Sequence, residues 1–437
     1  MTPSVEKLFA FLRQSPTPFH AVETIRKELD AQGFHALEES ARWTLRPGEK
    51  YYVTRNLSSI IAFMLPTSKD WSGFQIVASH CDSPTFKIKS NAEISVRGNY
   101  TQLNTEMYGG MLCASWMDRP LSVAGRIVVR TGDGVATRLV KVDRDMVLIP
   151  NVAIHMNRQA NDGVKYNPQV DMLPLYGDGE ASGGFLAEIA STAGVQQQEI
   201  LDTDLFLYNR MPGTVWGKNG EYISAPKLDD LECAYTSLQA FLRCDVKTLH
   251  GIPLCCVFDN EEVGSTTKQG ADSTLLYDVL RRITLGLGQT EEQYYTAVAS
   301  SMMLSADNAH AVHPNHPELT DPTNQVFINK GIVIKYNARQ KYTTDGVSGA
   351  IFKVICQRAG VPVQTFVNRS DMVGGGTLGN ISNSHVSLNT IDIGLPQLAM
   401  HSSYETAGTQ DVQYMIDGIA AFYQSGVTAV KDGQYRF

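Results

Sequence analysis

Apolar residues recur along the chain with two different spacings. Residues 3–32 have the spacing of helices and predict two of them, separated by the segment SPTPF and ended by Gly33. The runs YYVTR, SSIIAFML and GFQIVAS then predict strands. The last run is almost continuously apolar, as in a strand that is covered on both faces. The chain therefore begins as an α/β fold.

The pattern changes between residues 92 and 218. Short alternating runs such as RIVVR, TRLVKV and MVLIP are separated by Gly and Asp turns, and helical spacing is scarce until about residues 182–198. Short strands at such spacing, with turn residues between them, are typical of a small all-β module.

After residue 219 helices and strands alternate again. The predicted elements are a helix near Asp229, the strand IPLCCVFD, a helix over DSTLLYDVLRRIT, the strand GIVIKYN, a helix over VSGAIFKVICQRAG, the strands VQTFVN and VSLNTIDIG, and a final helix over VQYMIDGIAAFYQSG. Such alternation predicts a largely parallel sheet with helices on both faces. We therefore predict an α/β domain made of residues 1–91 and 219–437, interrupted by a β-rich domain at residues 92–218.

Composition narrows the functional classes by exclusion. The 437 residues carry a formal net charge of −8 without a block of like charges, which argues against a nucleic-acid partner. The N-terminal residues do not resemble a signal peptide, and no apolar run of about 18 residues predicts a membrane span. The seven cysteines show no CxxC spacing and fit reduced thiols. We expect a cytoplasmic protein with no membrane partner.

Polar residues follow several predicted strands, where ligand sites form in α/β sheets. They are His80 and Asp82 after GFQIVAS, Asp229 and Asp230 at a helix start, Asp259, Glu261 and Glu262 after IPLCCVF, Asp307, His310 and His313 after SMML, and His401 and Glu405 after VSLNTIDIGLPQLA. Taken singly, each has a structural explanation. A histidine can be hydrogen-bonded, an aspartate can cap a helix, and paired glutamates can form a solvated turn.

Taken together, these groups point to metal ions. Carboxylates and imidazoles that converge at one sheet edge repel and desolvate one another unless a cation is present. Five of them have the size and type to hold two divalent ions about 3.5 to 4 Å apart with a water molecule between them: His80, Asp229, Glu262, Asp307 and His401. Zinc accepts these ligands, as do cobalt and manganese. Asp229, a short side chain at a helix start, suits the bridging position.

Two further carboxylates are left for other roles. Asp82 can accept the free N–H of His80 and so orient the imidazole. Glu261, next to a ligand but not itself bound, has the position of a general base that takes a proton from the water.

Seven motifs stand in a characteristic order: SPTPFHAV near the N-terminus, HxD at 80–82, LDD at 228–230, DNEEVGS at 259–265, SADNAHAVHPN at 305–315, IKYN at 334–337 and QLAMHSSYE at 397–405. Together they resemble the aspartyl aminopeptidase family of dinuclear zinc exopeptidases. The resemblance covers nearly the whole chain. It implies an α/β fold of the zinc exopeptidase type, with a mixed central sheet flanked by helices and an inserted small β-rich dimerisation domain.

The resemblance also implies a ligand set for each of two zinc ions. One ion would be bound by His80, Asp229 and Asp307, and the other by Asp229, Glu262 and His401.

Three further residues acquire roles from the resemblance. Glu261 matches the catalytic base, and Asp82 matches the residue that orients the ligand histidine. His155, in the inserted domain, matches a histidine that is lent to the active site of a neighbouring subunit.

The implied activity is removal of acidic residues from peptides with a free N-terminus, by a homododecamer built from dimers through the inserted domain. A preference for acidic side chains requires a cation, and Lys335 with Tyr342 is the candidate. The glycine run DMVGGGTLG, which includes Gly376, matches the family's substrate-lining loop but is more open. It lacks the Lys-Ser/Thr of a phosphate loop.

Two other functions remain open from the residues alone. The same ligands would serve a dinuclear metal amidase or deacylase that acts on a substrate other than a peptide, because a fold and a ligand set do not fix the substrate. A non-catalytic assembly or cargo-binding module could also retain the fold, but it would be expected to lose a ligand or the base.

Overall fold

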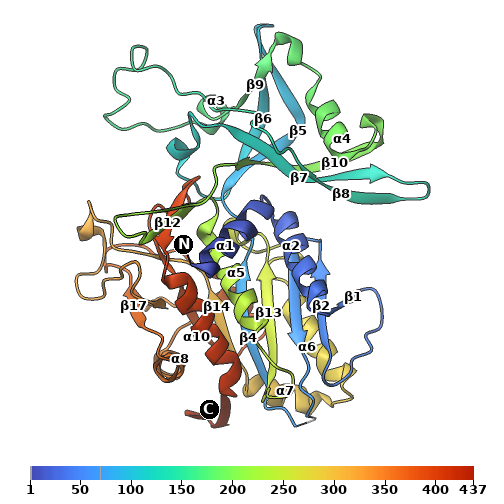
Figure 1. Ribbon diagram of the computed structural model, residues 1–437, viewed down its shortest axis with the longest axis vertical. Coiled ribbons are helices and arrows are strands. Elements are labelled where there is room, and N and C mark those ends of the chain that lie inside the picture. Colours follow the sequence, from blue (N-terminus) through green and yellow to red (C-terminus); the bar gives the residue numbers. More distant parts are fainter. Residues whose placement is uncertain (1, 69) are drawn as a thin grey trace.

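Nine strands form one sheet in the larger of two lobes (Figure 1). The structure is a computed structural model and describes residues 2–68 and 70–437. In spatial order the strands are β1 (His35–Leu37), β2 (Lys50–Arg55), β3 (Ser59–Met64), β13 (Ile252–Phe258), β4 (Phe74–His80), β14 (Met302–Ala306), β18 (Asn389–Gly394), β16 (Ile332–Tyr336) and β17 (Val363–Val367).

The sheet is mixed, which confirms the expected fold class. The central strands β13, β4, β14 and β18 run parallel, as do the pairs β1/β2 and β16/β17. The pairs β2/β3, β3/β13 and β16/β18 are antiparallel. A tight turn with positive φ at Asn56 and Leu57 joins β2 to β3, and a turn this short can only connect antiparallel neighbours. The expectation of a largely parallel sheet therefore holds for the centre and for the two edge pairs, and it is wrong where β3 and β16 join antiparallel to their neighbours.

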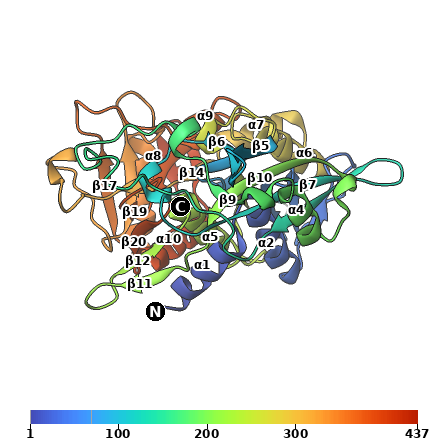
Figure 2. The ribbon, with the colours of Figure 1, turned by 90° about the horizontal axis from the view of Figure 1, so that it is seen from above.

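Helices cover both faces of this sheet (Figure 2). One face carries α1 (Pro3–Gln14), α2 (Pro18–Ala31), α5 (Leu228–Phe241), α8 (Gly346–Ala359) and α10 (Asp411–Ser425), and the other carries α6 (Leu275–Gly286), α7 (Glu291–Ala299) and α9 (Leu378–Ser382). Side chains along β13 alternate between the two cores. Cys255 packs with the first set of helices and Cys256 with the second. Burial on both faces explains why the central strands are apolar throughout.

The smaller lobe is a six-stranded antiparallel sheet with its own core and with helix α4 (Phe185–Ala193) packed on it. Its strands, in spatial order, are β8 (Val135–Lys141), β7 (Leu121–Arg130), β10 (Ile200–Asn209), β5 (Thr85–Val96), β6 (Tyr100–Tyr108) and β9 (Leu175–Asp178). Strand β5 begins at Thr85, shortly after β4 ends at His80. The chain therefore enters the smaller lobe directly from the end of a central strand.

Shorter elements complete the fold. They are the three-stranded sheet β11 (Thr214–Trp216), β12 (Tyr222–Ala225) and β20 (Glu405–Gly408), the pairs β15 (Ala309–His310) with β19 (Pro396–Gln397) and β21 (Thr428–Lys431) with β22 (Gln434–Arg436), and helix α3 (Pro168–Asp171). Among the residues that the structure describes, no helix combines the length and the apolar character that crossing a membrane requires.

Candidate active site

The ends of three parallel neighbours bring the site together. Strand β4 ends at His80, β14 ends one residue before Asp307, and β13 ends three residues before Glu261. Because β13, β4 and β14 are adjacent and parallel, their carboxyl ends meet at one edge of the sheet. Helix α5 begins at the same edge with Leu228 and Asp229.

The residues at this edge form three overlapping groups, in each of which one ligand atom per residue lies within 4.8 Å of the others. The groups are His80 with Asp229, Asp230 and Asp307; Asp229 with Glu262 and His401; and His80 with Glu261 and Glu262. The structure thus brings together all five residues that the sequence suggests as ligands, and it adds Asp230.

Asp229 lies between the two histidines. Its Oδ1 is 3.6 Å from Nε2 of His80, and its Oδ2 is 3.3 Å from Nε2 of His401. The same nitrogen of His401 is 3.4 Å from Oε2 of Glu262. A carboxylate with one oxygen toward each imidazole has the arrangement that a bridging ligand requires.

The crowding of carboxylates is energetically costly without a cation. Burial raises the pKa of Glu261 to about 7, and the charges of Asp307 and Asp82 add to the shift while His80 opposes it. Burial, together with the charge of Asp229, also raises the pKa of Glu262 well above its usual range. These carboxylates cannot all ionise comfortably at neutral pH unless positive charge is brought among them.

Asp229 behaves differently from its neighbours. Burial opposes its ionisation, but the hydrogen bond with His401 and the charge of His80 outweigh that effect and lower its pKa. The carboxylate that lies between the two histidines therefore has a lowered pKa, whereas the pKa values of Glu261 and Glu262 are raised.

The donor set fits divalent zinc. Three buried carboxylate oxygens, Oδ1 of Asp229, Oδ1 of Asp230 and Oε1 of Glu262, have no hydrogen-bond partner among the described residues. A buried unpaired oxygen is costly, and coordination of a cation would satisfy it. Imidazole nitrogens and carboxylate oxygens without a thiolate are ligands that zinc accepts.

Asp82 anchors the turn that carries the paired glutamates. Its Oδ1 accepts the main-chain N–H of Glu261 and its Oδ2 that of Glu262, each at 3.1 Å, and Oδ2 also accepts the hydroxyl of Tyr108 at 2.7 Å. The expected contact with His80 is present as well, with Nδ1 at 3.3 Å from Oδ1 and at 3.1 Å from the main-chain oxygen of Asp82. The aspartate therefore orients the imidazole and the glutamate turn together.

Sequence reasoning assigned no role to Glu405 or Asp230. Glu405 accepts the main-chain N–H of Asp229 at 3.0 Å with Oε2 and that of His401 at 2.7 Å with Oε1, so it ties two parts of the site together. Asp230 accepts the main-chain N–H of His80 at 3.1 Å. Glu405 stands in QLAMHSSYE and Asp230 in LDD, so the motifs marked both positions without indicating what the side chains do.

Lys335 and Tyr342 lie together beside Asp307. The Lys335 ammonium donates to the main-chain oxygens of Asp307 at 2.7 Å and Asn308 at 3.2 Å, and it is 5.3 Å from the ring centre of Tyr342. Lys335 is only 2% exposed. Gly376 is exposed, and a Cβ at this position would meet open space.

His155 belongs to none of the three groups that the described residues form. It lies in the exposed segment 151–167 of the smaller lobe, between β8 and α3 (Figure 1).

A mixed α/β sheet with this cluster at its strand ends defines a metallohydrolase with the fold of the zinc exopeptidases. The sequence profile of the aminopeptidase I zinc metalloprotease family (M18) matches residues 11–423. The chain belongs to this family and is a zinc aminopeptidase, a hydrolase of the exopeptidase class.

Curated relatives and solved structures agree with this assignment. A probable M18 family aminopeptidase 2 of Clostridium novyi is 45% identical over 425 residues, covering 95% of this chain and 98% of the relative. The corresponding protein of Pseudomonas aeruginosa is 40% identical, covering 96% and 97%. A chain in the complex of Ape4 and Nbr1 has a TM-score of 0.93 at 34% identity, covering 97% of this chain and 85% of that one. The mApe1 dodecamer of Saccharomyces cerevisiae has a TM-score of 0.84 at 27% identity, with 96% of each chain covered.

Proposed function

We propose that this protein is a dinuclear zinc aminopeptidase that releases acidic residues from the N-termini of peptides. The observation that carries the proposal is the position of Asp229 between His80 and His401, with Glu261 beside the cluster. His80, Asp229 and Asp307 would hold one ion, and Asp229, Glu262 and His401 the other. Cobalt or manganese would fit the same ligands.

Each group in the site has a step to perform. When bound, the two ions would polarise the scissile carbonyl and lower the pKa of a water molecule. Glu261 takes a proton from this water as its oxygen attacks the carbonyl carbon. The C–N bond then breaks, and Glu261 returns the proton to the departing nitrogen. Asp82 fixes the position of Glu261 through the main-chain N–H.

The preference for acidic residues rests on Lys335 and on two loops. Lys335 donates to the carbonyls of Asp307 and Asn308 and forms an ion pair with the Asp307 carboxylate at 3.7 Å, so it places positive charge beside one of the proposed zinc ligands. The loops that carry Tyr342 and the glycine run meet at one buried carboxylate. Asp392 accepts the hydroxyl of Thr343 at 2.6 Å and that of Thr377 at 2.5 Å. This anchor holds both loops near the Lys335 end of the site.

A scan of aminoacyl reporter substrates tests the activity. We expect hydrolysis of the aspartyl and glutamyl reporters to exceed that of the leucyl reporter by at least about tenfold, which is the discrimination that one well-placed charge can supply. Chelation should abolish all turnover, and zinc should restore it. N-acetylated reporters are the control and should be resistant. Equal rates for acidic and neutral reporters would refute the acidic preference, and turnover of acetylated reporters would refute the aminopeptidase activity.

We propose further that the smaller lobe, the inserted β-rich domain, mediates self-association and lends His155 to a neighbouring subunit. Residues 151–167 carry the exposed apolar side chains Val152, Ile154 and Met156, the last with 83% of its surface exposed. Clustered exposed apolar side chains are typical of an interface. By analogy with the mApe1 dodecamer, the assembly would be a homododecamer built from dimers. There His155 would donate a hydrogen bond to the oxyanion that forms on the substrate.

Complementation between two inactive variants tests this role of His155. Glu261→Gln removes the base and His155→Ala removes the lent histidine, and each variant alone should be nearly inactive. Assemblies co-expressed from both variants contain sites with an intact Glu261 and an intact His155 from a neighbour. We expect these mixed assemblies to regain roughly a quarter of wild-type kcat, the statistical share if subunits pair at random. No recovery in mixed assemblies that are shown to contain both chains would refute the role in trans.

A further inference from the structure

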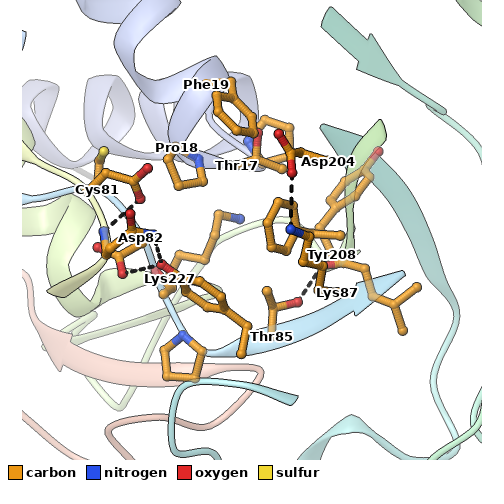
Figure 3. Close-up of a pocket in the computed structure, with 18 of the residues that line it drawn as sticks. Thr17, Pro18, Phe19, Cys81, Asp82, Thr85, Lys87, Asp204, Tyr208 and Lys227 are labelled. Carbon is orange, nitrogen blue, oxygen red and sulfur yellow. Dashed lines mark hydrogen bonds and ion pairs between the residues drawn. The ribbon is translucent and has the colours of Figure 1, made fainter. Parts of the chain in front are cut away.

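A cavity of about 420 Å³ is lined by residues of both lobes (Figure 3). Its walls come from the segment before α2 and the start of that helix, from β5, β6 and β10 of the smaller lobe, and from the turn after β4. The motif SPTPF forms part of this wall with Pro16, Thr17, Pro18 and Phe19. The peptidase chemistry described above makes no use of that motif. The volume lies in the range of sites for small organic ligands.

Most charges in this cavity are already paired. Asp204 accepts from Lys87 at 3.0 Å and from Arg126 at 2.9 Å, and the Arg126 guanidinium lies 4.2 Å from the ring centre of Phe19. The carboxylates of Asp82 and Glu405 accept main-chain N–H groups with both oxygens.

Two lysines are exceptions, Lys268 at the exposed rim and Lys227 in the interior. The Lys227 side chain extends into the centre of the cavity (Figure 3), and no hydrogen bond or ion pair joins its ammonium to any residue that the structure describes. The side chain is half-buried, and its backbone is fixed at the start of α5. A cation that points into a largely enclosed space without a partner favours an anionic occupant.

The remaining lining indicates what the anion is attached to. Phe19, Trp116, Phe206 and Tyr208 present aromatic surface, and helix α2 directs its N-terminal end toward the same space from Thr17. Aromatic walls bind flat apolar groups, and a helix N-terminus adds to the attraction for negative charge. We propose that this cavity is a binding site for a small organic carboxylate with an aromatic body, and that its carboxylate pairs with Lys227.

The cavity shares its walls with the supports of the active site. Asp82 holds the turn of Glu261, and Glu405 holds Asp229. Ser83, also in the wall, donates to the main-chain oxygen of Asp229 at 2.7 Å. An occupant would therefore contact residues that position the catalytic groups, while Glu261 and the five proposed zinc ligands do not line the cavity.

Calorimetric titration of the zinc-loaded protein tests the site with two matched probes, 3-phenylpropionate and its neutral isostere 3-phenylpropanamide. We expect the acid to bind at least about tenfold more tightly than the amide, because only the acid can form a charge-assisted bond. In Lys227→Met the acid should bind no more tightly than the amide. In Lys227→Arg the preference for the acid should remain. Lys268→Met removes an exposed lysine at the rim and should change nothing.

Phe206→Leu provides an independent test from the smaller lobe in case Lys227→Met does not fold or loses zinc. Loss of the ring should weaken binding of the acid by about threefold or more without altering zinc content. The proposal is overturned if acid and amide bind the wild type equally, if neither binds, or if Lys227→Met and Phe206→Leu both bind the acid as the wild type does. The last result would place the carboxylate elsewhere, for example on the zinc ions. None of these results bears on peptidase activity, so the proposed function would stand.

Discussion

Replacing Glu261 by Gln should abolish peptide hydrolysis while zinc content stays at the wild-type level. Glu261 lies in the cluster with His80 and Glu262, but the proposed ligand sets are complete without it. The amide keeps the size of the side chain and cannot accept a proton from water. General-base catalysis contributes about 10²- to 10⁴-fold, so kcat should fall by about that factor.

Two measurements separate this role from that of a ligand. Steady-state kcat on an acidic reporter gives the loss of rate, and elemental analysis gives the zinc per subunit. Glu262→Gln is the matched control at the adjacent position, and it should lose zinc as well as activity because Oε2 of Glu262 faces His401. A Glu261→Gln protein that retains a tenth of wild-type kcat would exclude Glu261 as the base. Loss of zinc in Glu261→Gln but not in Glu262→Gln would reverse the two roles.

The pH profile offers a further readout for Glu261. A general base acts only when it is deprotonated, so activity should fall as the pH decreases through its pKa. Burial raises the pKa of Glu261 to about 7 in the metal-free site. Bound cations favour the carboxylate form and shift this acid limb to lower pH. In Glu261→Gln the residual activity should lose this limb.

The sequence predicted the central elements because buried strands and helices require regular runs or stripes of apolar residues, which are easily recognised. Strands β4 and β13 are buried along their whole length, and helix α2 has a clear apolar face. Helix α7 gave no such signal, because only Tyr294 and Ala297 of its residues are buried. The antiparallel position of β3 depends on a turn with positive φ at Leu57. Leucine rarely adopts positive φ, so the sequence does not predict this turn.

The same limit applies to the candidate site. Strand ends and motif order located His80, Asp229 and Asp307 because each follows or begins a strongly patterned element. The function of Glu405 could not be deduced in this way. It depends on two main-chain N–H groups far away in the sequence, those of Asp229 and His401, that only the folded chain brings to one carboxylate. The cavity around Lys227 likewise exists only because two lobes meet, and no local pattern encodes it.

Asp229→Asn should deprive the site of metal rather than of one chemical step. Asp229 is the carboxylate that directs one oxygen toward each histidine, and its pKa is lowered by the hydrogen bond with His401 and the charge of His80 despite its burial. Asparagine is neutral and offers a single oxygen, so it cannot bridge two cations. Substitution of a residue that only hydrogen-bonds to a metal ligand already lowers metal affinity by about 10- to 100-fold. Substitution of a bridging ligand itself should therefore lower the affinity further.

Zinc content and thermal unfolding measure this loss. Dialysed Asp229→Asn should hold substantially less zinc per subunit than the wild type, and its kcat should fall by about 10³-fold or more, since the ions supply both Lewis acidity and the acidified water. A bound metal stabilises the folded state, so chelation should lower the Tm of the wild type but leave that of Asp229→Asn nearly unchanged.

Asp417→Asn, at a half-buried aspartate on α10 that is paired with Arg243, is the matched control and should behave as the wild type. Full zinc occupancy together with a tenth of wild-type activity in Asp229→Asn would show that neither metal binding nor turnover depends on Asp229 as a bridging ligand.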